Sequence, residues 1–287
     1  MTFFATFWGV RGSIPTPGAS TIRYGGNTPC ISIDRGDRTR VILDAGSGIR
    51  NLGRHLMEQP GWSETCLLLT HTHWDHIQGL PFFQPLAVPE FTLRIFGAVQ
   101  ETVTLERVLE LQTHPAVFPV PFSSAAAQLS ITHVEAEPFE VPDLVVTPFR
   151  LCHPGTTLGF RLVPHGSTRA FAYVTDNELG GGGEGRRDAG WHARLVRWLD
   201  GAHTLVHDAM YTTAMMPRRA GWGHSTTHEA VDLAIAAGCA RLVLFHHEPE
   251  HDDDTIDRLV ADAQAYARER GGALEVLGAV EGMRLAL

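Results

Sequence analysis

The sequence predicts an α/β fold, namely an αββα sandwich in which two mixed β-sheets pack back to back and helices cover the outer faces. Short apolar runs of about four to eight residues, bounded by turn residues, recur in two series, and segments of helical periodicity lie among them. Residues with metal-ligand chemistry follow the strands, where α/β folds collect their functional groups. With 287 residues and 44% hydrophobic content, we expect one domain over residues 1–287.

The predicted strands fall into two series, which indicates two sheets. The first series ends directly before a histidine-rich segment, and the second continues to the C-terminus. The strands are residues 3–8, 29–34, 41–44 and 65–70, then 91–96, 129–134, 144–153, 157–163, 169–175, 203–207, 241–245 and the C-terminal tail.

Five segments have helical periodicity, and the last two are entered through capping-type residues. Two other segments predict loops. The proline-rich residues 113–122 either cover a pocket or plug the core with Phe118 and Phe122, and the glycine-rich residues 179–185 lack the lysine and the G-K-[ST] ending of a phosphate-binding loop. The predicted helices are residues 49–58, 102–112, 191–199, 227–237 and 254–270.

Composition argues against several classes of protein. The net charge of −9, the pI of about 5.9 and the lack of a basic cluster differ from proteins that grip nucleic acid by neutralising phosphates. Residues 1–5 begin like a strand without a basic region or a long apolar segment, so we expect a cytoplasmic protein with no export signal or membrane anchor. The cysteines lie singly in apolar surroundings, which favours buried reduced thiols: Cys30, Cys66, Cys152 and Cys239.

The segment His71-Thr72-His73-Trp74-Asp75-His76 carries four ligand-type side chains directly after the apolar residues 66–70. On the extended or looped backbone after a strand, His71 and His73 project to the same side, so two imidazoles can reach one ion. Asp75 and His76 then turn toward a second position. A carboxylate beside imidazoles suits zinc, and also manganese or iron, and two adjacent sub-sites allow a dinuclear centre roughly 3.5–4 Å across.

Three later residues supply the further ligands that a dinuclear site needs. His153 ends the predicted strand at residues 144–152, and Asp176 and His246 each follow a predicted strand directly. Side chains at strand ends are held still by the backbone, as metal ligands must be. We therefore expect two divalent metal ions as cofactors, with Zn²⁺ as the first expectation and Mn²⁺ as the alternative.

The order of these seven residues resembles the metallo-β-lactamase superfamily, whose hydrolases carry H-x-H-x-D-H followed by His, Asp and His at later strand ends. The likeness covers most of the chain, including residues 9–13, 24–28 and 43–48. Within the superfamily the chain looks like the phosphodiesterase branch. Residues 223–230, GHSTTHEA, leading into residues 242–246, are similar to the H-x-T helix and final ligand of tRNA 3′-processing endoribonucleases and related cyclic-nucleotide phosphodiesterases.

The resemblance implies two metal-binding groups joined by a bridging carboxylate, with a hydroxide between the ions. Two cations lower the pKa of a bridging water and neutralise phosphate oxygens, so no side-chain nucleophile is required. The implied first group is His71, His73 and His153, the second is Asp75, His76 and His246, and Asp176 bridges them.

The resemblance also implies the catalytic residues. Residues 206–211, VHDAMY, are similar to the H-E-A-T-[FY] element, with Asp208 in place of the usual glutamate as partner of a catalytic histidine. His224, before the helix at residues 227–237, is placed to donate to a phosphoryl oxygen or to protonate the leaving alkoxide. Alternatively, it is a helix-entry residue that bonds locally. The expected catalytic set is His224, Asp208 and Asp75, the last of which is also a ligand.

Three neighbouring features have other interpretations. His247 should face away from His246 if the strand continues, so we rank it well behind His246 as a ligand. Asp44 either orients a ligand histidine or caps a turn. The acidic residues 248–254 are expected to cap a helix and not to bind metal.

The function expected first is hydrolysis of a small phosphodiester, such as a cyclic nucleotide or cyclic dinucleotide. A tRNA 3′ endonuclease is the nearest alternative, but that family inserts a basic arm between the His and Asp ligands, and here 23 positions separate His153 from Asp176. Thioester or lactone hydrolysis and a metal-stabilised sensor are further alternatives. We expect a small phosphodiester or nucleotide as substrate and no stable nucleic-acid complex, and the oligomeric state stays open, with a homodimer among the options.

Overall fold

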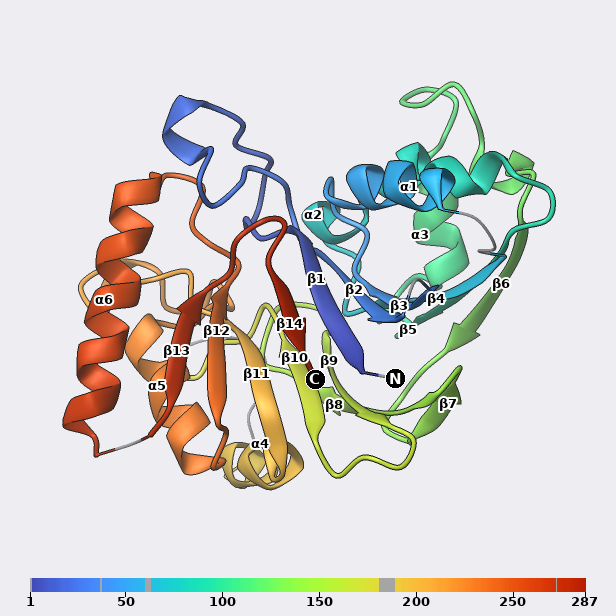
Figure 1. Ribbon diagram of the computed structural model, residues 1–287. Coiled ribbons are helices and arrows are strands. Elements are labelled where there is room, and N and C mark those ends of the chain that lie inside the picture. The colour runs from blue at the N-terminus through green and yellow to red at the C-terminus, as the bar shows by residue number, and fades with distance from the viewer. Residues whose placement is uncertain (1, 37, 60–62, 181–188, 272) are drawn as a thin grey trace.

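The fold is taken from a computed structural model, which describes residues 2–36, 38–59, 63–180, 189–271 and 273–287. Within these residues the strands form two seven-stranded mixed sheets that pack against each other, with helices on the outer faces (Figure 1). The predicted αββα sandwich is confirmed. None of the helices in the described chain combines the length and the apolar character that a membrane-spanning segment needs.

In the first sheet the pairing is antiparallel on the side of the chain termini and parallel on the other side. From edge to edge its strands are β14 (Arg284–Ala286), β1 (Phe3–Gly9), β2 (Cys30–Arg35), β3 (Arg38–Leu43), β4 (Glu64–Leu69), β5 (Thr92–Gly97) and β6 (Gln128–His133). The parallel half begins where β3 pairs with β4.

The second sheet has the same division into a parallel and an antiparallel half. From edge to edge its strands are β13 (Glu275–Gly278), β12 (Arg241–Phe245), β11 (Ala202–Asp208), β10 (Ala170–Val174), β9 (Leu158–Pro164), β8 (Leu144–Arg150) and β7 (Phe139–Val141). The pairing is parallel from β13 to β10 and antiparallel from β10 to β7.

The helices divide between the two outer faces (Figure 1). The first sheet is covered by α1 (Ile49–Glu58) and α3 (Leu105–Gln112), and the second by α4 (Trp191–Leu199), α5 (Thr227–Ala236) and α6 (Asp253–Glu269). A single turn, α2 (Trp74–Ile77), follows β4. The 3₁₀ turns are η1 (Ala19–Thr21), η2 (Leu80–Phe82), η3 (Gln84–Ala87), η4 (Phe122–Ser124) and η5 (Met216–Arg218).

The strand sequences explain which faces are buried. Along β1 the buried residues alternate with half-buried ones, so Phe3, Ala5 and Phe7 point into the core between the sheets. The central parallel strand β10 is buried throughout because helices cover its other face. Cores on both faces of each sheet therefore hold the strand ends, and with them the polar residues beyond, in fixed positions.

Helix caps follow the predictions. Asp252 is the N-cap of α6 and accepts a hydrogen bond from the Thr255 N–H (2.8 Å), so the capping interpretation of the acidic segment is confirmed there. Thr226 and Glu229 form a capping box at the start of α5, which fixes the chain just after residue 224. All four cysteines are buried and none forms a disulfide, as expected.

Several predicted boundaries are wrong. β5 and β6, predicted in the second series, belong to the first sheet because the chain crosses over through η2, η3 and α3 to pair them parallel to β4. β8 ends at Arg150, so His153 lies on a loop and not at a strand end. β7 was not predicted.

The two predicted loops have different outcomes. In the 113–122 segment Phe122 packs on the outer core and Phe118 lies edge-on to Phe82 (5.5 Å). Most of the glycine-rich loop, residues 181–185, lies outside the described residues.

Candidate metal centre

The predicted site residues meet where parallel strands of both sheets end. Asp44 follows β3 directly, and His71 lies two residues beyond β4 in the first sheet. In the second sheet Asp176 lies two residues beyond β10, Asp208 ends β11 and His246 follows β12. The carboxyl ends of parallel strands are the usual place for functional groups in α/β folds, because loops there lie above a fixed scaffold. Both sheets thus contribute to one site.

The backbone turns sharply at three of these residues. Asp44, Asp176 and His246 have φ angles of +59°, +48° and +59°, in the left-handed region that residues other than glycine rarely adopt. Each comes within two residues of the end of a buried strand. The turn breaks the strand's alternation and directs these side chains to the site, and such backbone strain is typical of functional positions.

The first group brings His71, His73 and His153 around Asp176, with one nitrogen or oxygen of each within 4.8 Å of the others. The Nε2 atom of His153 lies 2.9 Å from Nδ1 of His73. Asp176 Oδ2 lies 3.5 Å from His153 Nε2 and 3.6 Å from His71 Nε2. Three imidazole nitrogens and one carboxylate oxygen therefore converge.

The second group brings Asp75, His76 and His246 around the same Asp176, and all four side chains are buried. Here the other oxygen of Asp176 is used: Oδ1 lies 3.1 Å from Nε2 of both His76 and His246. Asp75 Oδ2 lies 3.3 Å from His76 Nε2 and 3.2 Å from His246 Nε2. The two groups are thus joined through the two oxygens of a single carboxylate.

These distances fit divalent metal ions. Ligand atoms about 2.0–2.1 Å from a tetrahedral zinc ion lie about 3.3–3.4 Å from one another, and the separations above, from 2.9 Å to 3.6 Å, are centred near that value. Nε2 of His71 and Nε2 of His76 are buried and have no hydrogen-bond partner in the described part of the chain. An unpaired buried polar atom destabilises a protein by about 1–3 kcal/mol, and a cation bound in each group would pair these nitrogens.

Hydrogen bonds behind the two groups fix the imidazole tautomers. His76 donates from Nδ1 to Asp44 (2.8 Å), and His153 donates from Nδ1 to the Gly223 carbonyl (2.9 Å), so each directs Nε2 toward its group. Asp44 also accepts from the Thr70 N–H (2.8 Å) and from the Tyr173 hydroxyl (2.9 Å). Both interpretations of Asp44, orienting a histidine and capping a turn, therefore apply in the structure.

The charges of the cluster also favour cation binding. Burial works against ionisation of Asp75 and Asp176, but the surrounding imidazoles, chiefly His76 and His246, outweigh it and hold the pKa of both carboxyl groups well below the usual range. Burial lowers the pKa of His71 well below its ordinary value and that of His153 to about 4. These imidazoles are therefore neutral near pH 7, as metal ligands must be.

His224 and Asp208 form a buried pair beside the two groups. His224 donates from Nδ1 to Asp208 Oδ2 (2.8 Å), and its ring lies 5.1 Å from that of His246 and 5.3 Å from that of His153. Burial opposes protonation of His224, but Asp208 outweighs it and raises the pKa to about 9. The predicted partnership of these residues is present, and Asp208, His224 and His246 also lie close enough to form a third ligand-type group.

A comparison with known families decides the classification. The sequence pattern of the family described as "Beta-lactamase superfamily domain" matches residues 39–247, a span that begins in β3 and ends just after His246. The chain belongs to this superfamily. The chain is a metal-dependent hydrolase, with His and Asp clusters suited to divalent ions.

Individual relatives agree with the superfamily assignment. Ribonuclease Z of Natronomonas pharaonis is 26% identical over 96% of this chain and 98% of its own length. The metallo-beta-lactamase fold protein YhfI from Bacillus subtilis superposes with a TM-score of 0.71 at 17% identity, covering 100% of both chains. A diphosphatase of the PhnP family superposes with a TM-score of 0.67 at 17% identity, covering 99% of this chain and 98% of its own. The two structures show that the fold is shared.

Some contacts of this superfamily site were not predicted from the sequence. Glu178 is fully buried and accepts hydrogen bonds from the N–H groups of Gly221 and Gly223 (both 3.0 Å). The Ser13 N–H donates to Asp75 Oδ2 (2.8 Å). The available signal was that Glu178 lies two residues after Asp176. By contrast His247 bonds the Ala279 carbonyl (2.9 Å) from Nε2 and takes no part in the ligand groups, as its expected orientation implies.

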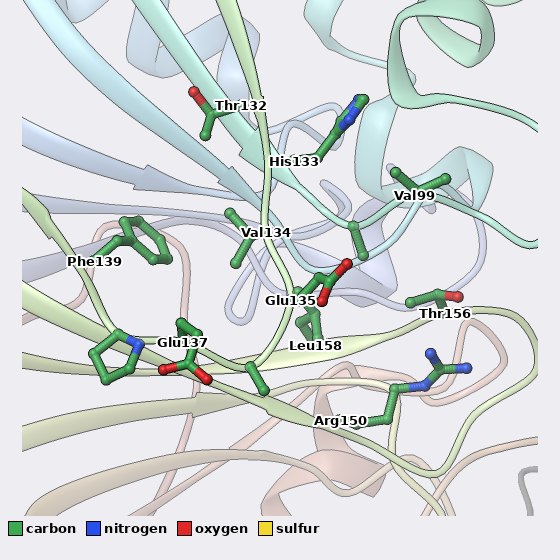
Figure 2. Close-up of a pocket in the computed structure, with 13 residues that line it drawn as sticks. Val99, Thr132, His133, Val134, Glu135, Glu137, Phe139, Arg150, Thr156 and Leu158 are labelled. Carbon is green, nitrogen blue, oxygen red and sulfur yellow. The ribbon is translucent and has the colours of Figure 1, made fainter.

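A cavity of about 670 Å³ lies beside the loop that carries His153 (Figure 2). Its wall includes Thr156, at the end of that loop, and Leu158, whose N–H donates to the Thr70 carbonyl (2.9 Å) just before the histidine-rich segment. Figure 2 shows Arg150 next to Thr156 at one side of the cavity. The cavity has the volume of a small-molecule site, and its lining includes the end of the His153 loop but none of the residues of the two groups themselves.

Proposed function

We propose that this chain is a dinuclear metal-dependent phosphodiesterase that hydrolyses small phosphodiesters such as cyclic nucleotides or cyclic dinucleotides. The observation that carries the proposal is the position of Asp176. Its Oδ2 faces His153 at 3.5 Å in the first group and its Oδ1 faces His76 at 3.1 Å in the second. A carboxylate that faces two ligand groups with different oxygens is suited to bridging two cations.

In this proposal each group holds one divalent ion. When bound, the ions supply a water of lowered pKa and neutralise phosphate oxygens, so the chain needs no side-chain nucleophile. Imidazole and carboxylate ligands suit Zn²⁺, and also Mn²⁺. The proposed ligands are His71, His73 and His153 for one ion, Asp75, His76 and His246 for the other, and Asp176 for both.

The role of His224 follows from its hydrogen bond to Asp208. That bond (2.8 Å) uses Nδ1, so Nε2 is the remaining polar atom of the ring. Because its pKa is raised to about 9, the ring is protonated near neutral pH. We propose that it donates from Nε2 to a phosphoryl oxygen or to the leaving alkoxide. Asp208 is held in turn by the Met210 N–H (3.0 Å), which keeps the donor in a fixed orientation.

The short segment between two of the proposed ligands, His153 and Asp176, supports our proposal that the substrate is small. The chain from His153 to Asp176 contains only a loop and the hairpin strands β9 and β10. The basic arm expected of a tRNA-processing enzyme would be inserted there. The net charge of −9 also disfavours a long polyanion, so we propose that the protein forms no stable nucleic-acid complex.

Processing of tRNA 3′ ends is the second candidate, because the relative named Ribonuclease Z is similar over 96% of this chain. It would require an RNA-binding surface elsewhere on the molecule. Hydrolysis of a thioester or lactone could use the same metal centre, but a protonated donor held beside both groups is better matched to phosphoryl oxygens and an alkoxide.

A hydrolysis panel tests the proposal. The protein, loaded with Zn²⁺ or Mn²⁺, would be given bis-p-nitrophenyl phosphate, 3′,5′- and 2′,3′-cyclic nucleotides, cyclic dinucleotides, precursor tRNA, a phosphomonoester, a β-lactam and a thioester. We expect cleavage of the small diesters, abolished by chelation, with phosphomonoesters and β-lactams as poor substrates. Thioester turnover without diester cleavage, or efficient tRNA cleavage that weakens steeply with salt, would overturn it.

A further inference from the structure

Trp222 is a large aromatic side chain that the fold leaves 55% exposed close to the metal centre. It lies on the turn between η5 and α5, one residue before Gly223 and two before His224. Single exposed apolar residues are common and need no explanation by themselves. The way in which this turn is held, however, is specific.

A buried carboxylate fixes the turn on both sides of Trp222. Glu178 accepts hydrogen bonds from the N–H groups of Gly221 and Gly223, each at 3.0 Å. The Gly223 carbonyl in turn accepts from Nδ1 of His153 (2.9 Å). Gly223 has a φ of +86°, and a Cβ added there would lie 2.1 Å from His153 Nδ1, so only glycine fits. The backbone that carries the exposed indole is therefore held directly against a ligand residue.

One face of the indole is covered by a cation. The guanidinium carbon of Arg219 lies 4.4 Å from the ring centre of Trp222 and 5.7 Å from that of Tyr211. The Tyr211 ring meets the His224 ring edge-to-face at 5.7 Å. Arg219 also lies 3.8 Å from a carboxylate oxygen of Glu248, which places an opposite charge beside the guanidinium. A continuous series of ring and cation contacts thus connects the proposed proton donor to Trp222.

We propose that Trp222, backed by Arg219, is the platform on which the nucleobase of the substrate stacks. This inference rests on the proposed phosphodiesterase function and narrows its substrate to nucleotides. An aromatic ring with an open face stacks with any base, because every base has a π-face. A guanidinium on the opposite face holds the ring in place through a cation–π contact. The rigid turn means that little ordering is required when a base binds.

The test compares two substrates that differ only in the base. Trp222→Ala and Trp222→Phe would be assayed with 3′,5′-cyclic AMP and with base-free ribose 3′,5′-cyclic phosphate, using the metal-replete protein. We expect Trp222→Ala to lower the ratio of kcat/KM for the nucleotide to that for the base-free substrate about 10-fold, mainly through KM. Trp222→Phe should restore most of the ratio. Phe82→Ala, which removes another exposed ring (56%), is the matched control and should not change it.

Direct binding separates this inference from the proposed function. AMP should bind the metal-loaded wild type about 10-fold more tightly than Trp222→Ala, measured by calorimetry, whereas ribose 5-phosphate should show no such difference. If no diester is cleaved but this AMP difference is found, the phosphodiesterase assignment fails and the base platform stands. If AMP does not bind, or if Trp222→Ala affects nucleotide and base-free ligands equally, the platform is wrong and Trp222 only supports the turn.

Discussion

The first and second groups share Asp176 but are built differently. Every member of the second group is buried; its His76 is held from behind by Asp44, and the Ser13 N–H donates to the Asp75 oxygen that faces the group. The first group contains an exposed member, His73. The second group is therefore the enclosed half of the centre, and the first group is the half that solvent can reach.

The two groups also differ in charge, and the enclosed second group is the more negative. The second group has two carboxylates among its four residues, with Asp44 as a third behind His76. Burial opposes protonation of His76, yet these carboxylates outweigh it and hold its pKa well above the ordinary value, so a bound cation would take the place of the proton on Nε2. The first group has the shared carboxylate and three imidazoles, and burial lowers the pKa of His71 and His73. Because negative charge attracts cations most strongly where water is excluded, the second group should bind its ion more tightly.

The largest effect is expected where the two groups meet. Asp176→Ala removes one ligand from each group, so metal content should fall from about two ions per chain to less than one, and diester hydrolysis should be lost with it. Elemental analysis after saturation with zinc or manganese and gel filtration measures this. A wild-type content that stays near one, unchanged in Asp176→Ala, would falsify the dinuclear arrangement and remove the basis of the comparison.

His224 tests whether a residue beside both groups can act without binding metal. Its ring contacts the rings of one histidine from each group, and we propose that it is a ligand of neither ion. His224→Ala should keep both metal ions and the fold while slowing turnover by roughly 10²–10³, the usual loss when one transition-state donor is removed. Metal content and kinetics must be measured on the same preparation. Loss of an ion would mean that His224 is a ligand and would weaken the role of His246, and wild-type turnover would make the histidine structural.

The sequence predicted the composition of the cluster better than the way it is held. The spacing of His71 and His73 indicates a shared ion because strand geometry is local. His153 was expected at a strand end, but β8 stops at Arg150, and the ring is oriented instead by the carbonyl of Gly223, 70 positions away. A contact between such distant residues depends on how the two sheets are packed, which periodicity does not encode.

The assignment of strands to the two sheets shows the same limit of prediction from the sequence. Apolar runs predicted β5 and β6, but not that they would extend the first sheet, because the crossovers through η2, η3 and α3 decide which edge they join. The clamp of Glu178 on the turn at residues 221–223 spans 43 positions or more and has no local sequence signal beyond its place after Asp176. The members of the cluster could thus be predicted from their order and spacing in the sequence, whereas the residues that support them could be identified only from the fold.

A smaller effect should fall mainly on the second group. Asp44→Asn preserves shape but replaces the carboxylate that accepts from His76 Nδ1 at 2.8 Å. Outer hydrogen bonds of this kind change metal affinity by about 10–100-fold, so the affinity for the tighter ion should fall by that factor. The affinity for the other ion should change less, because among the described residues Asp44 contacts the first group only through the Thr70 hydroxyl, which lies 3.1 Å from His71 Nδ1. Competition with a chromophoric chelator gives both affinities.

Tyr173→Phe is the matched control for Asp44→Asn, since it removes another hydrogen bond to Asp44 (2.9 Å) without touching a ligand. Its effect on metal affinity should be clearly smaller. If Asp44→Asn lowered the affinity for both ions equally, Asp44 would support the whole centre, and the two groups would not be held independently.

The smallest expected effect is the difference between the two groups in the unaltered protein. The first group has one exposed member, His73, and its only carboxylate is the shared Asp176. Its ion should therefore dissociate first, with an affinity about 10-fold lower than that of the ion in the second group. His73→Ala and His246→Ala each remove one imidazole, one from each group. Chelator titration should find that His73→Ala retains the tighter ion and His246→Ala the weaker one. If His73→Ala instead loses the tighter ion, the enclosed group is the weaker site, and burial and charge do not set the order of affinity here.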